Sequence, residues 1–315
     1  MRGARAVAFL SLATVISACA AATGEPSASA PPSASADPTP IPVTFTTIDL
    51  PAAGGGIVPV GDILFVAVDG GMVRVDPGSG DVSEIFPGIF NLAFDGENLW
   101  AGGEGQLQHL DSLTGSVVQG WPLEYDAVYV AADATAVWAS DTGRSVVHRI
   151  DPGDGHTVAS IEVPSTPKGT VLGEGSVWVA CDGAATVVRI DPATNTIVAE
   201  IEVGAGPHTI ATGEGFVWVT NRHSQTLSKI DAATNEVVAT VPHVAPNVAV
   251  GVAVGDGVVY VAYDHGVALV DPASAVVIGY FEVPDAELFY DLKVVGDTLW
   301  ATETFGNTMY GFDLS

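Results

Sequence analysis

Two basic side chains occupy matching places in this chain, and their spacing indicates a shared site. Lys168 and His208 each follow a proline, and each stands ten residues before a tryptophan. Asn91 and Asp291 fall close to the same level in their own copies of the chain's repeated pattern, and the segments after the aromatic residue of each copy contribute Arg222, Asp264 and Glu303. Such groups hold polar ligands when they converge, and carboxylates suit Ca²⁺ or Mg²⁺. We therefore predict a ligand-binding site of these residues, with no cofactor beyond such a cation.

A repeated segment of about 40 residues must bring these side chains together. The clearest copy, from Gly173 to Pro207, reads GEGSVWVACDGAATVVRIDPATNTIVAEIEVGAGP. One aromatic residue marks each copy, with spacings of 35, 38, 40, 40, 42 and 40 residues, at Phe65, Trp100, Trp138, Trp178, Trp218, Tyr260 and Trp300. A repeat that cannot bury its own apolar face must stack on its neighbours, and this period is the length of a propeller blade.

Within each copy the apolar residues alternate with polar ones, which is typical of strands. The pattern predicts an all-β, seven-bladed β-propeller of four-stranded antiparallel blades. The last copy ends after its third strand, whereas residues 43–50 form a spare strand before the first blade. We expect this N-terminal strand to pair with the last blade and close the ring, because closure removes two exposed sheet edges. A six-bladed ring with a stray hairpin is the alternative.

The N-terminus has the features of an export signal. Arg2 and Arg5 precede an apolar run over residues 6–16 that is too short to span a bilayer stably. The sequence Ile-Ser-Ala-Cys then resembles the bacterial lipobox. This resemblance implies cleavage of residues 1–18, a lipid on Cys19 and attachment to the extracytoplasmic face of the cell membrane. An ordinary cleaved signal with a chance cysteine is the alternative.

Two segments follow the predicted cleavage site. Residues 19–42 begin with the lipidated cysteine and are rich in Ala, Ser and Pro, so they cannot bury enough apolar surface to fold. As a flexible coil this tether would span roughly 25–30 Å. Residues 43–315 then form the propeller, which we expect to stand off the membrane on its tether.

Composition narrows the set of partners. The chain has 10 Lys and Arg against 37 Asp and Glu, a net charge of −27. This field repels nucleic acid, so a DNA-binding role is disfavoured and a monomer that binds a ligand or an envelope protein is expected. After Cys19, the single remaining cysteine is Cys181, which excludes an internal disulfide in the mature domain. We interpret Cys181 as a small core filler rather than a reactive thiol.

Several of the singled-out residues have plainer explanations. The aromatic residue of each copy stands within an apolar run, which favours core packing over a stacking platform. Aspartates of the short connections, such as Asp69, Asp141 and Asp182, are typical turn formers. His223 and His265 lie in short polar loops and are expected to be solvated. His208 is harder to dismiss, because it begins an inner strand that faces the propeller axis.

The repeat itself resembles a known family. The copies share a Pro-x-x-Ile-Ala start, a Gly-x-Val-Trp-Val core and a Lys/Arg-Ile-Asp-x-x-Thr-Asn turn, most clearly over residues 165–241. This pattern resembles the YVTN-type β-propeller repeat, and it is similar to the repeats of virginiamycin B (streptogramin) lyases. The resemblance covers residues 43–315 and implies a propeller. Most of the matching residues are strand anchors and turns, so they indicate the fold more than an activity.

The likeness to the lyases also implies catalytic residues, and only part of that set is present. The family pattern places histidines after proline in successive blades and an acid beside magnesium. His208 matches one histidine, whereas Lys168 and Val250 occupy the neighbouring places. Asn221 stands where the acid would be, and Glu303 supplies an acid in a different blade. Elimination needs a base and an electrophile held together, so lyase activity is disfavoured.

These observations predict a function and leave two alternatives open. We predict a membrane-anchored extracytoplasmic lipoprotein whose propeller binds a ligand or a partner protein without catalysis of its own. The first alternative is a lyase or hydrolase that uses His208, Glu303 and a divalent cation at the channel mouth. The second is an interaction module that works through its side faces, in which case the channel residues take no part.

Overall fold

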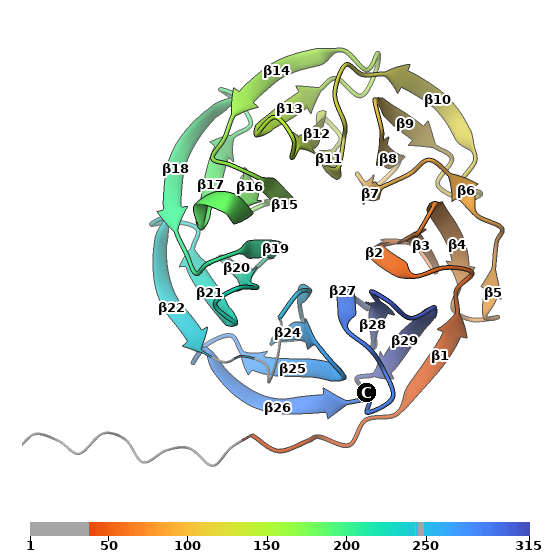
Figure 1. Cartoon of the computed structure of the whole chain (residues 1–315), viewed down its shortest axis with the longest axis vertical. Helices are drawn as coiled ribbons and strands as arrows, with labels where there is room; N and C mark the ends of the chain where they lie inside the picture. The colour runs from red at the N-terminus through yellow and green to blue at the C-terminus, as the bar shows by residue number, and fades with distance from the viewer. Residues whose placement is uncertain (1–37, 243, 245–248) are drawn as a thin grey trace, which may run out of the picture. The chain divides into compact units, whose positions relative to one another are not determined.

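The computed structural model describes residues 38–242, 244 and 249–315. Residues Pro38–Ser315 form one compact unit, in which seven β-sheets surround a central axis (Figure 1). The predicted signal peptide, Cys19 and most of the predicted tether lie outside the described residues. The tether was expected to run to residue 42, but its last residues already contact the propeller: the Ile41 N–H donates to the Tyr280 carbonyl at 2.8 Å.

The first three blades follow one another along the chain. Blade 1 contains β2 (Gly54–Val60), β3 (Ile63–Val68), β4 (Gly71–Asp76) and two short strands that both pair with β4, β5 (Asp81–Val82) and β6 (Phe86–Pro87). Blade 2 contains β7 (Asn91–Phe94), β8 (Leu99–Gly103), β9 (Gln106–Leu110) and β10 (Val117–Pro122). Blade 3 contains β11 (Tyr129–Asp133), β12 (Ala136–Asp141), β13 (Val146–Ile150) and β14 (Thr157–Glu162).

The remaining blades repeat the same antiparallel order. Blade 4 contains β15 (Pro167–Gly173), β16 (Ser176–Cys181), the 3₁₀ turn η1 (Asp182–Ala184), β17 (Thr186–Asp191) and β18 (Thr196–Glu202). Blade 5 contains β19 (Pro207–Gly213), β20 (Phe216–Asn221), β21 (Thr226–Asp231) and β22 (Glu236–Pro242). Blade 6 contains β23 (Val252–Gly255), β24 (Val258–Tyr263), β25 (Gly266–Asp271) and β26 (Val276–Glu282). Blade 7 contains β27 (Phe289–Val295), β28 (Thr298–Glu303) and β29 (Thr308–Asp313).

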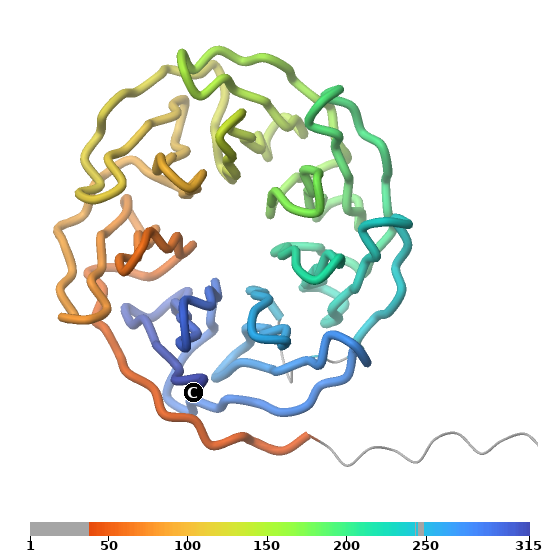
Figure 2. The backbone as a smooth tube through the Cα atoms, turned by 180° about the vertical axis from the view of Figure 1, so that it is seen from behind, coloured from red at the N-terminus to blue at the C-terminus, as the bar shows by residue number. Residues whose placement is uncertain are grey.

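The N-terminal strand completes the last blade. Strand β1 (Phe45–Asp49) pairs antiparallel with β29, in a register that places Phe45 opposite Phe312 and Ile48 opposite Met309. The orange N-terminal segment therefore lies beside the blue last blade, also when the ring is seen from behind (Figure 2). The predicted closure and the seven blades are confirmed, and the six-bladed alternative is wrong.

Apolar side chains fill the spaces between neighbouring blades. Trp178, for example, is fully buried and packs in one cluster with Ile210 and Val217 of the next blade. The other marker aromatics are likewise buried, with no more than 6% of their surface exposed. Cys181 is buried as well, and burial raises the pKa of its thiol to about 12. The aromatic ring is thus core packing, and Cys181 is an inert filler at neutral pH.

Cations on three successive blades tie each blade to the next. Each lies on the third strand over the tryptophan of its own blade, with 5.6, 5.1 and 5.4 Å to the ring for Arg149, Arg189 and Lys229. Each donates to a carbonyl of the following blade: Arg149 to Pro192 at 2.8 Å, Arg189 to Ala232 at 2.7 Å and Lys229 to Pro272 at 2.6 Å. These contacts add directional bonds to an interface that is otherwise apolar.

Candidate functional site

Side chains from several blades converge on the axis. A cavity of about 140 Å³ lies between the inner strands, and many of its lining residues stand at or near the first residues of those strands. Its wall includes three of the residues predicted from sequence, Asn91 of β7, His208 of β19 and Asp291 of β27. The spacing argument therefore placed these three side chains at one cavity, although they come from blades 2, 5 and 7.

Two tyrosines that sequence reasoning missed face each other in this cavity. Tyr129 of β11 and Tyr290 of β27 come from blades 3 and 7, and both line the cavity. Burial, together with Tyr129 and Asp291, raises the pKa of Tyr290, so its hydroxyl stays protonated. The His208 ring meets the Tyr290 ring edge-on at 6.1 Å. Tyr129 and Tyr290 stand nine and ten residues before Trp138 and Trp300, so the repeat alignment held the signal for them.

His208 is more enclosed than expected. The sequence suggested a side chain in a wet channel, but only 6% of the residue is exposed. Burial lowers the pKa of His208 to about 4, with Lys168 and Arg222 as further causes. The imidazole is therefore neutral at physiological pH and offers one donor and one acceptor. Its Nδ1 lies 3.1 Å from the hydroxyl of Thr209.

Asp291 serves the fold as well as the cavity. Its Oδ2 accepts the Ile57 N–H at 2.8 Å, which links blade 7 to blade 1. Its Oδ1 lies 3.6 Å from Lys293 Nζ, and the residue is 8% exposed. Asn91 is half-buried nearby, and its Oδ1 accepts the Leu92 N–H at 3.0 Å. The Asp291 carboxylate thus lies beside a positive charge and already accepts a backbone hydrogen bond, and both contacts weaken it as a cation ligand.

The other four predicted residues do not line the axial cavity. Lys168 Nζ forms an ion pair with Asp182 Oδ2 at 3.1 Å, and the positive charge of Lys168 lowers the pKa of His208. Arg222 is exposed and acts on His208 in the same way.

Glu303 and Asp264 are engaged elsewhere. Glu303 is 4% exposed, and its Oε1 accepts the Glu287 N–H at 2.8 Å and the Tyr310 hydroxyl at 3.4 Å. Asp264 forms an isolated backbone bridge with Leu288. These contacts bind Glu303 and Asp264 to the loop that enters blade 7, so the pairing of His208 with Glu303 that the lyase alternative needs is not formed at the cavity.

A groove extends from the axial cavity over blade 1. Strand β2 opens with Gly54, Gly55 and Gly56, and the hollow above these glycines measures about 240 Å³. A second hollow of about 370 Å³ continues it along the loop before β7. Phe90 lines both hollows and is 48% exposed. Thr304 of blade 7 lines the first hollow and has a buried hydroxyl with no partner among the described residues.

Gly56 lies at the inner end of this groove, and neither its backbone conformation nor its packing requires a glycine. A Cβ on Gly56 would lie 3.6 Å from Asn91 Nδ2 and 3.8 Å from Asp291 Oδ2, which is ordinary van der Waals contact. Its φ is also not positive. A side chain would therefore fit the strand, and the missing side chain leaves a path from the groove to the cavity.

One group in the described part of the chain has the spacing of a metal site. The ligand atoms of Asp151, Asp154 and His156 lie within 4.8 Å of one another in the exposed β13–β14 turn. Their hydrogen bonds already serve that turn, since Asp151 accepts the Gly153 N–H at 2.7 Å and Asp154 accepts the His156 N–H at 3.0 Å. These side chains stabilise the turn through their hydrogen bonds, and they lie outside the axial cavity.

Comparisons with solved structures place the fold among β-propellers. A streptogramin B lyase superposes with a TM-score of 0.76, 15% identity, and coverage of 87% of this chain and 98% of the other. The β-propeller domain of Myceliophteria thermophila Cps50 (Swd1) superposes with a TM-score of 0.73 and 13% identity, and the match covers 87% of this chain and 100% of the other. The WD40 β-propeller domain of Doa1 superposes with a TM-score of 0.70 and 11% identity, and the match covers 86% of this chain and 97% of the other.

Identities this low establish the fold alone. No family model matches the sequence, and no curated protein matches it either. The described residues contain no helix that is long and apolar enough to cross a membrane. The protein is therefore a seven-bladed β-propeller by its fold.

Proposed function

We propose that this protein is an extracytoplasmic lipoprotein whose propeller binds a partner on its axial face. The observation that carries the proposal is the convergence of Asn91, His208 and Asp291 from three blades on one cavity. Buried polar side chains cost stability unless they are paired, so a cluster of them at an open end of the ring indicates recognition.

The shape of the site favours an extended segment of a protein over a drug-sized molecule. The axial cavity alone, at about 140 Å³, is below the roughly 300 Å³ at which small-molecule pockets begin, and the site exceeds that size only by running along the groove. The groove over blade 1 adds length rather than depth, and the exposed Phe90 supplies an apolar wall. A side chain that enters the cavity while its backbone crosses the glycines of β2 would use both parts of the site.

Catalysis by elimination is less well supported. The cavity offers one neutral histidine, and Glu303 is bonded within the loop that enters blade 7. A general base needs an electrophilic partner within hydrogen-bond reach of the same substrate, and the pair of His208 with Glu303 does not meet at the cavity. The likeness to a streptogramin B lyase thus supports a shared scaffold and not a shared reaction.

Membrane attachment is the second part of the proposal, and it rests on the sequence of residues 1–19. A diacylglyceryl group on Cys19 would hold the protein at the membrane, and the replacement Cys19→Ala should release it or block its maturation. The measurement is partition between detergent and aqueous phases. Wild-type protein that remains in the aqueous phase would exclude the anchor without touching the binding proposal.

The binding site is tested by photo-crosslinking in the cells that make the protein. A benzoylphenylalanine at Phe90 lies in the groove, and one at Val238, which is 49% exposed on β22, serves as the matched control on the perimeter. We expect one discrete adduct from position 90 and none from position 238. Adducts from position 238 alone would instead support binding through the side faces.

A further inference from the structure

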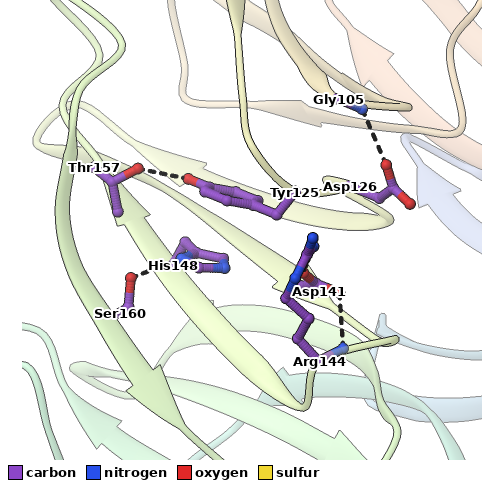
Figure 3. A network of polar contacts seen from close by, with 8 residues as sticks. All are labelled: Gly105, Tyr125, Asp126, Asp141, Arg144, His148, Thr157 and Ser160. Atoms are coloured by element: carbon purple, nitrogen blue, oxygen red, sulfur yellow. Dashed lines mark hydrogen bonds and ion pairs between the residues drawn. The ribbon is translucent and has the colours of Figure 1, made fainter.

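A second cavity lies away from the axis, between the outer parts of blades 2 and 3. It measures about 490 Å³, within the usual range of small-molecule sites. Its wall combines apolar groups, including Leu123 and Tyr125, with charged ones, including Glu124 and Arg144. Figure 3 shows its central side chains, with His148 between Tyr125, Ser160 and Arg144.

His148 is the one histidine at its position in the seven blades. The aligned residues are small or apolar in four blades, namely Val73, Val188, Ser228 and Ala268, whereas blades 2 and 7 have Gln108 and Tyr310 there. His148 is 6% exposed, and burial lowers its pKa to about 4. Its Nδ1 lies 2.9 Å from Ser160 Oγ, whereas its Nε2 has no hydrogen-bond partner among the described residues. An unpaired buried polar atom is costly, and it points to a missing partner.

The surroundings hold this imidazole ready for a ligand. Its ring stacks on the Tyr125 ring at 3.5 Å between centroids, with 10° between the planes. The Tyr125 hydroxyl in turn bonds Thr157 Oγ1 at 2.7 Å, so the loop after blade 2 is fixed to the outer strand of blade 3. In Figure 3 the free edge of the ring points toward Arg144 and Asp141. The orientation of His148 is thus determined from three sides before any ligand arrives.

Only part of the Arg144 guanidinium is hydrogen-bonded within the protein. Its Nη1 donates to Asp141 Oδ2 at 2.7 Å, and the Asp141 side chain is 3% exposed while that of Arg144 is 60% exposed. Within the described residues, no acceptor is bonded to its Nε or Nη2. A guanidinium edge of this kind binds a carboxylate through two parallel hydrogen bonds.

The charges of the cavity select the class of ligand. A net anion would be repelled by a protein of net charge −27, whereas a ligand with a positive group alone would leave the free edge of the Arg144 guanidinium without an acceptor. Glu124 lines the same cavity and is close enough to act on Arg144 electrostatically. A molecule with one carboxylate and one ammonium group satisfies both residues without net charge.

We propose that this cavity binds a free α-amino acid, with its carboxylate on Arg144 and His148 Nε2 and its ammonium on Glu124. The side chain of the amino acid would lie against Leu123 and the Tyr125 ring. This site shares no residue with the axial cavity or the blade 1 groove, so the inference stands apart from the proposed function.

The test is calorimetric titration of the purified full-length protein with a panel of free L-amino acids covering small, apolar, aromatic and polar side chains. The tightest binder is then compared with its amide, which lacks the carboxylate, and with its N-acetyl form, which lacks the ammonium. We expect each derivative to bind at least about tenfold more weakly, because each loses a charge-assisted contact. The absence of heat from every amino acid at millimolar concentration would overturn the proposal.

Variants assign the contacts. Arg144→Gln keeps a donor for Asp141 but loses the fork, and Glu124→Gln changes an exposed residue, so both should fold and both should bind about tenfold more weakly or worse. Arg74→Gln removes the same charge from blade 1 and should leave affinity within about twofold. Equal affinity for Arg144→Gln and Arg74→Gln would refute the carboxylate contact. Equal binding of the acid and its amide would refute it as well.

Discussion

Truncation of Ile48 in the closing strand should destabilise the whole ring. Ile48 is 8% exposed and packs in one cluster with Ile57, Trp300 and Met309, so it joins the first and last blades. Large-to-small changes at buried isoleucines cost about 2–5 kcal/mol. Because β1 is an outer strand that can partly collapse onto the gap, we expect about 2–3 kcal/mol for Ile48→Ala. For a domain of this size that is a fall in Tm of roughly 4–10 °C.

The matched control lies one residue earlier on the same strand. Thr47 is exposed and opposes Tyr310, so Thr47→Ala should change stability by less than about 0.5 kcal/mol. Urea unfolding measures both variants, and the midpoint should shift for Ile48→Ala with an unchanged slope. Equal midpoints for the two variants would mean that β1 does not hold the ring closed, and the account of closure would be refuted.

Two further predictions concern buried polar groups. Lys229→Arg should be nearly neutral because the two preceding blades use arginine there, whereas Lys229→Met should cost about 2 kcal/mol by urea unfolding, since the Pro272 carbonyl loses its donor. The pKa values of His148 and His208 are about 4 in the folded state against 6.5 ordinarily, so the unfolded state takes up protons first and stability falls from pH 6.5 toward 4. By pH 5 each histidine should cost about 2 kcal/mol relative to pH 7, and a double glutamine variant that loses as much stability as wild type over that range would contradict this assignment.

Most of the fold could be predicted because the same strand pattern recurs in every copy of the repeat. The spacing of the marker aromatics set the number of blades, and the spare strand before Gly54 set the closure. The sequence pattern indicated strand bounds less sharply: β19 begins at Pro207, because pairing with β20 continues past the bulge between Pro207 and Ile210. The outer strand of blade 1 is broken into β5 and β6, which no spacing rule indicated.

The candidate site was only partly predictable. Alignment on the aromatics gave the height of a residue along the axis, so Asn91, His208 and Asp291 were placed at one cavity. It did not give the direction of each side chain at the end of a strand, and Glu303, the last residue of β28, therefore stood in the predicted site while its carboxylate accepts the Glu287 N–H.

Two other features depended on what sequence spacing does not encode. The groove over blade 1 arises where glycines leave space, and an absent side chain gives no chemical signal in a sequence. The cavity at His148 depends on Tyr125, whose loop lies outside the repeat pattern.

The central claim is that the axial face binds a partner, and one comparison tests it most directly. Gly56→Phe would fill the path between groove and cavity, where a Cβ meets no closer contact than 3.6 Å. Gly120→Phe adds the same ring to β10, where a Cβ lies 3.9 Å from the nearest atom. Envelope extract is passed over each immobilised variant with its Tm checked beforehand. We predict that Gly56→Phe loses the bound component while Gly120→Phe retains it as wild type does, and equal retention by both variants would contradict the account.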